Sequence, residues 1–192
     1  MRKTKTTIAL RRACICSLFA ALLCVLSPFA IPIGAVPVSL SVFAVLLCAA
    51  MLGPLSASVS VVVYLLLGAI GLPVFGGGMG GFGVLIGPTG GYLWSYLPMC
   101  LISGLLYRAL FKRRGMSWTM RAILGFLAGL PGLLVCYVCG TLQYMLVAKI
   151  SLAAAIVVCV LPFLLLDLLK LLLVWILGDR LHRVSAIQKI FY

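Results

Sequence analysis

The sequence predicts an all-α membrane protein, a bundle of six transmembrane helices that forms one domain over residues 1–192. Hydrophobic residues make up 65% of the chain and charged residues only 9%, whereas soluble proteins carry about 25% charged residues. Apolar runs follow one another with short interruptions, and about 20 such residues cross a bilayer as a helix. The basic residues, which give a net charge of +13, lie in clusters between these runs. We therefore expect lipid to be the solvent for most of the chain.

Glycine, proline and polar residues divide the apolar sequence into the six predicted spans. In order, these are residues 13–32, 38–52, 55–71, 93–111, 122–148 and 162–180. A turn around residues 34–37 precedes the second span, and Gly53-Pro54, a pair that breaks helices, separates it from the third. Because Pro162 interrupts a run that is long for one span, we expect a short buried or interfacial helix before Val160.

The N-terminal segment has the basic start and apolar run of a signal peptide. However, the run is long and no small-residue cleavage site ends it. We therefore expect a basic tail, residues 1–12, followed by a first helix that is retained in the membrane.

The distribution of basic residues predicts the orientation of the bundle. The tail 1–12 and the connection 108–121 each hold five Lys or Arg residues, and three more follow residue 177. With six spans these clusters fall on one face, while the opposite loops carry only Lys149. The face richer in Lys and Arg is normally cytoplasmic. We expect both termini in the cytoplasm and the glycine-rich loop 72–91 outside.

The residue types argue against a nucleic-acid-binding protein, a metalloprotein and an enzyme. The positive charge follows the pattern of membrane topology and does not form a basic surface on a soluble domain. All eight cysteines lie in apolar stretches, and the pair Cys136 and Cys139 has no second pair to complete a metal site. No nucleophile–base pair is visible, and His182 is the only histidine. We expect a binding or transport protein without metal or cofactor.

The chain contains only two acidic residues. Asp179 lies among basic residues at the end of the last span, which is typical of an interfacial charge. Asp167 lies inside an apolar run, and Lys170 follows one turn later on the same helix face. A charge within a membrane helix costs about 2.5–3.5 kcal/mol on insertion scales and usually faces a bundle interior. The pair is therefore either a structural ion pair or a ligand site.

Residues 71–92 form a loop that is rich in glycine. The spacing Gly78-x-Gly80-x-x-Gly83 matches the dinucleotide fingerprint only formally, because no strand precedes it. Gly87-Pro-Thr-Gly-Gly lacks the lysine of a phosphate-binding loop. Glycine lets the backbone approach a ligand closely, and irregular backbone at membrane depth is tolerated where it lines a cavity. We expect this loop to line a pocket; a flexible surface loop is the alternative.

Small residues recur at every fourth position of the first span, at Ala9, Ala13, Ser17 and Ala21. Such a stripe allows another helix to approach closely. Small residues are common in membrane helices, so the stripe indicates either a docking face or chance.

Several motifs, in the right order and over nearly the whole chain, closely resemble the BioY family, the biotin-binding S components of energy-coupling factor (ECF) transporters. The motifs are Gly71-Leu-Pro-Val-Phe75 with the following glycines, Gly87-Pro-Thr-Gly-Gly-Tyr92, Pro162-Phe-x-x-x-Asp167-x-x-Lys170, the turn Val36-Pro37-Val38-Ser39, and the pair Tyr137 and Gly140. The resemblance implies a six-helix S component in a bacterial cell membrane that captures biotin from outside. It also implies a membrane scaffold (the T component) and two cytoplasmic ATPases as partners.

The resemblance further implies roles for individual residues. Asp167 and Lys170 would be the principal polar contacts of biotin. The rest of the pocket would come from Ser39, Gly77, Gly80, Gly87, Thr89, Gly90, Gly91, Tyr92 and Gln143. The scaffold would contact Ala13, Ser17 and Ala21.

Two positions depart from the family pattern. Ser41 lies near the position where glutamine is expected, and Gln143 stands where tryptophan is expected. Loss of an aromatic wall would weaken packing against biotin, while Gln143 could hydrogen-bond the ligand or a neighbouring helix. An S component for another small vitamin, or a solitary biotin facilitator, is the alternative function.

Overall fold

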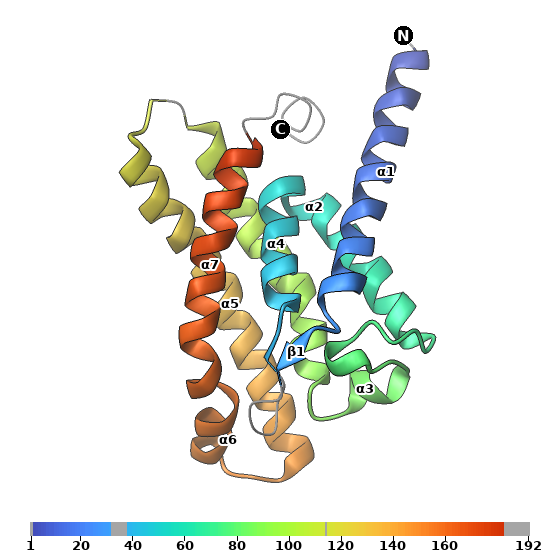
Figure 1. Cartoon of the computed structure of the whole chain (residues 1–192), viewed down its shortest axis with the longest axis vertical. Coiled ribbons are helices and arrows are strands. Elements are labelled where there is room, and N and C mark those ends of the chain that lie inside the picture. Colours follow the sequence, from blue (N-terminus) through green and yellow to red (C-terminus); the bar gives the residue numbers. More distant parts are fainter. Residues whose placement is uncertain (1, 32–37, 114, 183–192) are drawn as a thin grey trace.

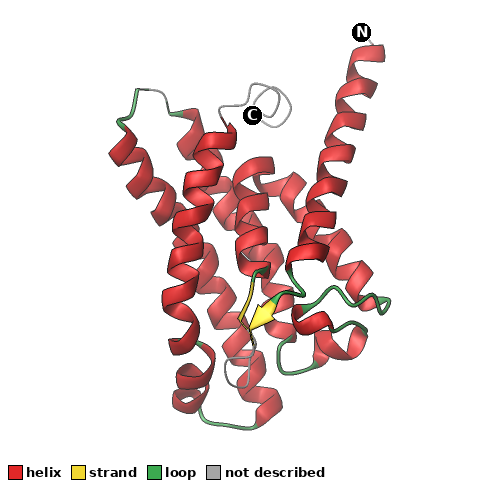
Figure 2. Cartoon of the chain, viewed as in Figure 1, coloured by secondary structure: helices red, strands yellow, loops and turns green. Residues whose placement is uncertain are grey.

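The computed structural model describes residues 2–31, 38–113 and 115–182, and almost all of them are helical (Figure 2). The long helices are α1 (Arg2–Leu26), α2 (Ser41–Ala69), α4 (Gly90–Lys112), α5 (Trp118–Ala148) and α7 (Leu161–His182). The short elements are α3 (Phe82–Ile86), α6 (Leu152–Cys159), the 3-10 turn η1 (Gly76–Gly78), and the strands β1 (Ala30–Ile31) and β2 (Val38–Ser39), which pair antiparallel.

Helix α2 reverses its direction at Gly53. This residue has φ +71°, in the left-handed region that favours glycine, and Pro54 then occupies the first turn of the second arm. The thiol of Cys48 lies 4.0 Å from the carbonyl oxygen of Ala57, although nine residues of straight helix would span about 13 Å. A Cβ on Gly104 of α4 would lie 2.8 Å from Pro54, so α4 packs directly against this turn. The two arms of α2 therefore run in opposite directions (Figure 1).

The structure confirms an all-α membrane protein with five to six candidate spans. Within the described residues, five helices are long and apolar enough to cross a membrane. The two arms of α2 match the predicted second and third spans, but neither arm reaches the about 20 residues of a full span. The sequence predicts six spans, whereas five helices qualify, because the two arms turn at Gly53 without a connecting loop and together form the single helix α2.

Two predicted boundaries of the first span are wrong. α1 begins at Arg2, so the described part of the predicted tail 1–12 is helical and continuous with the span. α1 ends at Leu26 instead of Pro32, because the chain then leaves the helix to form the β1–β2 pair. The predicted turn at residues 34–37 lies outside the described residues.

Serine side chains set two helix starts in the second half of the chain. The Oγ of Ser117 accepts a hydrogen bond from the backbone N–H of Met120, so α5 begins at Trp118, four residues earlier than predicted. Ser151 caps α6 in the same way. α6 is the short helix expected before Val160, and α7 follows it directly.

The start of α1, the α4–α5 connection and the end of α7 lie at one end of the bundle (Figure 1). The α5–α6 connection, which holds Lys149, lies at the opposite end. β1 and α3 lie in that opposite half (Figure 1), and the N–H of Gly81, just before α3, donates to the carbonyl of Gly68 near the end of the second arm of α2 at 2.7 Å. Residues 44–52 of the first arm are almost fully buried and form the centre of the core. Phe75 and Leu85 of the glycine-rich segment belong to the same buried core.

Candidate ligand-binding site

A cavity lies between the β1–β2 pair, the glycine-rich segment and the helices α2, α4, α5 and α7. Its lining residues are Ser39, Ser41, Val42, Phe75, Gly76, Met79, Val84, Thr89, Tyr92, Leu93, Tyr96, Cys136, Tyr137, Phe163, Asp167 and Lys170. Most of these side chains are apolar or aromatic, and a few polar groups converge on one wall. This composition is typical of a site for a small organic molecule.

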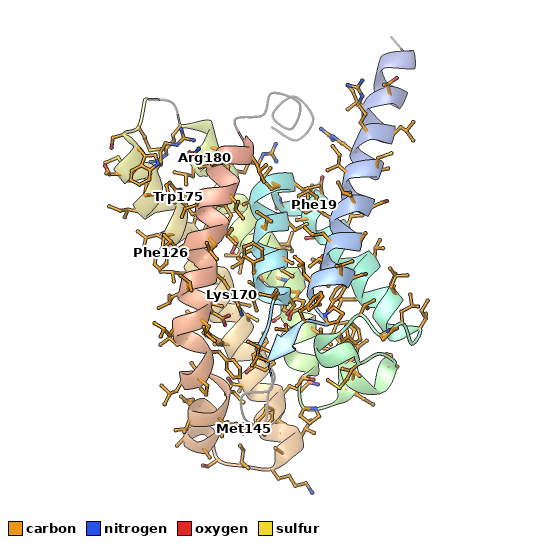
Figure 3. All side chains as sticks on the ribbon, in the orientation of Figure 1. Phe19, Phe126, Met145, Lys170, Trp175 and Arg180 are labelled. Carbon is orange, nitrogen blue, oxygen red and sulfur yellow. The ribbon has the colours of Figure 1, made fainter. Side chains whose placement is uncertain are left out.

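The polar wall is built around a buried ion pair on α7. The Nζ of Lys170 lies 2.7 Å from Oδ1 of Asp167, and the hydroxyl of Tyr137 donates to Oδ2 at 2.8 Å. Lys170 also donates to the backbone carbonyl of Ser39 at 2.9 Å, which ties α7 to β2. Asp167 is 4% exposed and Lys170 is 8% exposed. In Figure 3, Lys170 extends from the middle of α7 into the bundle at the level of β1.

This ion pair retains hydrogen-bonding capacity for a ligand. An ammonium group has three donors, and two of those of Lys170 have the partners given above. A carboxylate accepts about four hydrogen bonds, and those from Lys170 and Tyr137 account for two on Asp167. Because both groups line the cavity, they can donate to and accept from a bound molecule without breaking their own contact.

A chain of hydroxyl groups forms the neighbouring part of the wall. The Oγ of Ser41 hydrogen-bonds both the Oγ of Ser39 and the hydroxyl of Tyr96. Tyr96 and Ser41 are both buried. The short side chain of Ser41 thus joins β2 to α4. The family pattern predicts a glutamine near this position.

Aromatic side chains form the other walls. Phe75 is 1% exposed and packs edge-on against Tyr64, with ring centroids 5.6 Å apart. The hydroxyl of Tyr92 donates to the carbonyl of Cys159 at 3.2 Å, so the ring bridges from α4 to α6. Phe163, at the start of α7, completes the lining. An apolar ring with polar substituents on one side fits these surroundings.

The sequence profile of the BioY family matches residues 1–187. The chain belongs to the BioY family. It is 39% identical over 171 residues to the biotin transporter BioY2 of Lactococcus lactis subsp. cremoris, covering 88% of this chain and 89% of that protein. It is 36% identical over 169 residues to the biotin transporter BioY of Thermotoga maritima, covering 88% and 94%.

The fold of this BioY-family chain is similar to the crystal structure of the S-component for biotin from an ECF-type ABC transporter. The TM-score is 0.84 and the identity is 26%, and the match covers 96% of this chain and 97% of that one. The likeness therefore extends over the whole bundle, including the elements that line the cavity.

The structure brings five of the predicted site residues together in the cavity. They are Ser39, Thr89, Tyr92, Asp167 and Lys170. These residues come from β2, the end of the glycine-rich segment, α4 and α7, so the fold unites positions that are far apart in the sequence.

The other predicted site residues do not line the cavity; these are Gly77, Gly80, Gly87, Gly90, Gly91 and Gln143. The Nε2 of Gln143 donates to the carbonyls of Leu85 at 3.1 Å and Gly87 at 2.8 Å. Of the two roles left open for Gln143, the structure shows the bond to a neighbouring helix, α3. A Cβ on Gly91 would lie 2.4 Å from the carbonyl of Cys139. Gly91 therefore allows α4 to approach α5 closely.

Several cavity residues were not predicted. Phe75 and Phe163 lie inside two of the family motifs, beside the glycines and charged residues that indicate the site in the sequence. Tyr96 lies four residues after Tyr92 on α4, so helical spacing places the two on one face. This spacing was a usable signal in the sequence.

Among the described residues, no cluster of His, Cys, Asp and Glu could hold a metal ion.

The predicted docking residues lie on the outer face of α1. Ala13, Ser17 and Ala21 are exposed, whereas the opposite face contacts α2. There, Ser60 donates to the carbonyl of Cys16 at 2.9 Å. The stripe is therefore accessible to another helix in the isolated BioY-family chain.

Gly140 of α5 leaves the space that the ring of Tyr92 occupies, because a Cβ at this position would lie 2.3 Å from that ring. We expect Gly140→Ala to lower the free energy of unfolding by about 1–3 kcal/mol, the cost of inserting a group into a packed core. Thermal unfolding in detergent measures this change. Gly83→Ala is the matched control, since nothing lies within 4 Å of a Cβ there, and it is expected to keep the wild-type midpoint. Equal midpoints for the two variants would contradict this role of Gly140.

Proposed function

We propose that this protein is the S component of an ECF-type transporter and that it captures biotin from outside the cell. The observation that carries the proposal is the buried pair of Asp167 and Lys170 within an aromatic cavity of a BioY-family chain. Biotin combines an apolar ring and chain with a ureido group and a carboxylate. Such a ligand needs apolar walls together with both a donor and an acceptor.

The ureido group of biotin is the end that suits this pair. It has N–H donors for Asp167 and a carbonyl acceptor for Lys170, so both residues serve one end of the ligand. The carboxylate of biotin would gain from Lys170 but would be repelled by Asp167, which is in contact with Lys170 at 2.7 Å. The apolar chain then lies along the aromatic walls that include Phe75 and Phe163.

The energy for uptake comes, in this proposal, from two cytoplasmic ATPases that act through a membrane scaffold. The exposed stripe Ala13, Ser17 and Ala21 supports a docking face for that scaffold, because small residues let helix backbones approach closely. A solitary biotin facilitator would need neither partner. Copurification of ATPase subunits with the tagged chain separates the two functions.

Uptake of labelled biotin tests the function directly. A biotin-requiring bacterium without its own uptake system is expected to accumulate biotin when it produces this chain with the scaffold and ATPases. The same cells without this chain are the control. Accumulation of a different labelled vitamin, with no biotin uptake, would instead support an S component for that vitamin.

We propose that both termini are cytoplasmic, with the glycine-rich segment outside, so that six segments cross the membrane. In a variant without native cysteines, Arg113→Cys is expected to react with an impermeant reagent only from inside, and Phe82→Cys only from outside. Phe82 is 61% exposed, whereas a Cβ at Gly80 would lie 2.3 Å from the carbonyl of Leu72. Labelling of position 113 but not of position 82 from outside would show the inverted orientation.

A further inference from the structure

A second hollow lies between α4 and α5, toward the end of the bundle where the 113–117 connection joins these helices, and shares no residue with the ligand cavity. Leu106 is 40% exposed and Leu127 is 49% exposed, so the walls face outward. The small side chains of Ala109 and Ala128 help to leave the hollow open, with a volume of about 370 Å³. Because α4 and α5 are both candidate spans, this apolar groove faces lipid.

Arg113 lies at the polar end of the groove. The whole sequence has two acidic side chains and 15 Lys and Arg residues. Both acids are engaged in the bundle, since Asp167 pairs with Lys170 at 2.7 Å and Asp179 pairs with Arg121 at 2.7 Å. Among the described residues, both carboxylate side chains are thus paired with basic residues other than the exposed Arg113. The neighbouring Lys112 and Arg114 add positive charge in the sequence.

We propose that this groove binds one anionic phospholipid, with an acyl chain between Leu106 and Leu127 and the phosphate on Arg113. A guanidinium pairs with a phosphate through two parallel hydrogen bonds. A zwitterionic lipid offers the same phosphate together with a cationic group that the local positive charge repels. Basic pockets between transmembrane helices are known to hold anionic headgroups. Phosphatidylglycerol has the required chemistry, and this lipid site is independent of the substrate of the protein.

Native mass spectrometry of the purified, delipidated full chain tests the site. Phosphatidylglycerol and phosphatidylcholine with identical acyl chains are added separately, and the retained lipid is counted. We expect the wild type to prefer phosphatidylglycerol by about fivefold, since one basic residue near a surface contributes about 1 kcal/mol. Arg113→Gln is expected to remove most of this preference. Arg11→Gln, which makes the same charge change on the exposed part of α1, is the matched control and keeps the preference.

A second variant tests the acyl-chain part of the site. Ala109→Phe fills the groove from an exposed position and is expected to lower retention of phosphatidylglycerol while leaving Arg113 in place. Glycerol 3-phosphate, a headgroup without acyl chains, is expected not to displace the lipid. Equal retention by the wild type and Arg113→Gln would overturn the proposal. Displacement by glycerol 3-phosphate, or full retention by Ala109→Phe, would overturn it as well.

Discussion

Asp167→Asn and Lys170→Ala are each expected to weaken biotin binding at least about tenfold, or about 1.4 kcal/mol. The two side chains form an ion pair of 2.7 Å and both are buried. Removal of one partner leaves the other charge unpaired in a low-dielectric site, at a cost of about 3–5 kcal/mol. Part of this cost also falls on the protein without ligand, so the loss of affinity is smaller. Calorimetric titration of folded, monodisperse variants measures it.

Asp179→Asn is the matched control, because it is the same substitution on the same helix. Asp179 lies twelve residues after Asp167, about 18 Å along the helix, and it pairs with Arg121 at 2.7 Å. We expect this variant to bind biotin with nearly wild-type affinity. If both pocket variants also kept wild-type affinity, the Asp167–Lys170 pair would be structural and the biotin site would lie elsewhere.

Biotin methyl ester distinguishes the two ends of the ligand at this pair. If the ureido group contacts Asp167 and Lys170, blocking the carboxylate leaves the loss of affinity in both variants unchanged. If the carboxylate of biotin contacts Lys170 instead, Lys170→Ala no longer weakens binding of the ester relative to wild type.

The double substitution Ala13→Trp with Ser17→Trp is expected to abolish biotin uptake and copurification of the scaffold. Both positions are exposed on the outer face of α1, and two indole rings there prevent close approach of a partner helix. Biotin binding by the purified variant should remain at the wild-type level, because neither residue lines the cavity. Uptake assays and affinity purification of the tagged chain measure the two effects.

Leu18→Trp with Val25→Trp is the matched control for this double substitution. These side chains are also exposed on α1, at 67% and 61%, but they are already large and lie to one side of the small-residue stripe. We expect this control to keep uptake. Uptake that survives the change at Ala13 and Ser17 would remove the stripe as the docking face.

The helices were largely predictable from the sequence, because apolar runs in this chain end at strong local signals. Gly53-Pro54 is such a signal, and it marks the reversal of α2. The start of α1 was missed because its basic residues indicated a tail, although Lys and Arg are good helix formers. The β1–β2 pair was missed because strands of two residues have no periodicity that a sequence can show.

The charged part of the site was predictable, and its aromatic part was not. Asp167 and Lys170 are conspicuous because charges inside an apolar run are expensive and rare. Phe75 and Phe163 carry no such signal, since an aromatic residue in an apolar sequence can face a cavity, the core or lipid. Gln143 has two plausible partners in the sequence, the ligand and a neighbouring helix, and its hydrogen bonds to the carbonyls of Leu85 and Gly87 depend on a tertiary arrangement that the sequence does not display.

Titration of biotin into the detergent-purified chain is the most direct measurement of the proposed function. The cavity lined by Asp167 and Lys170 predicts saturable binding of one biotin per chain, with no comparable binding of riboflavin or thiamine. A folded, monodisperse protein that shows no saturable binding of biotin, or that binds another vitamin instead, would contradict it.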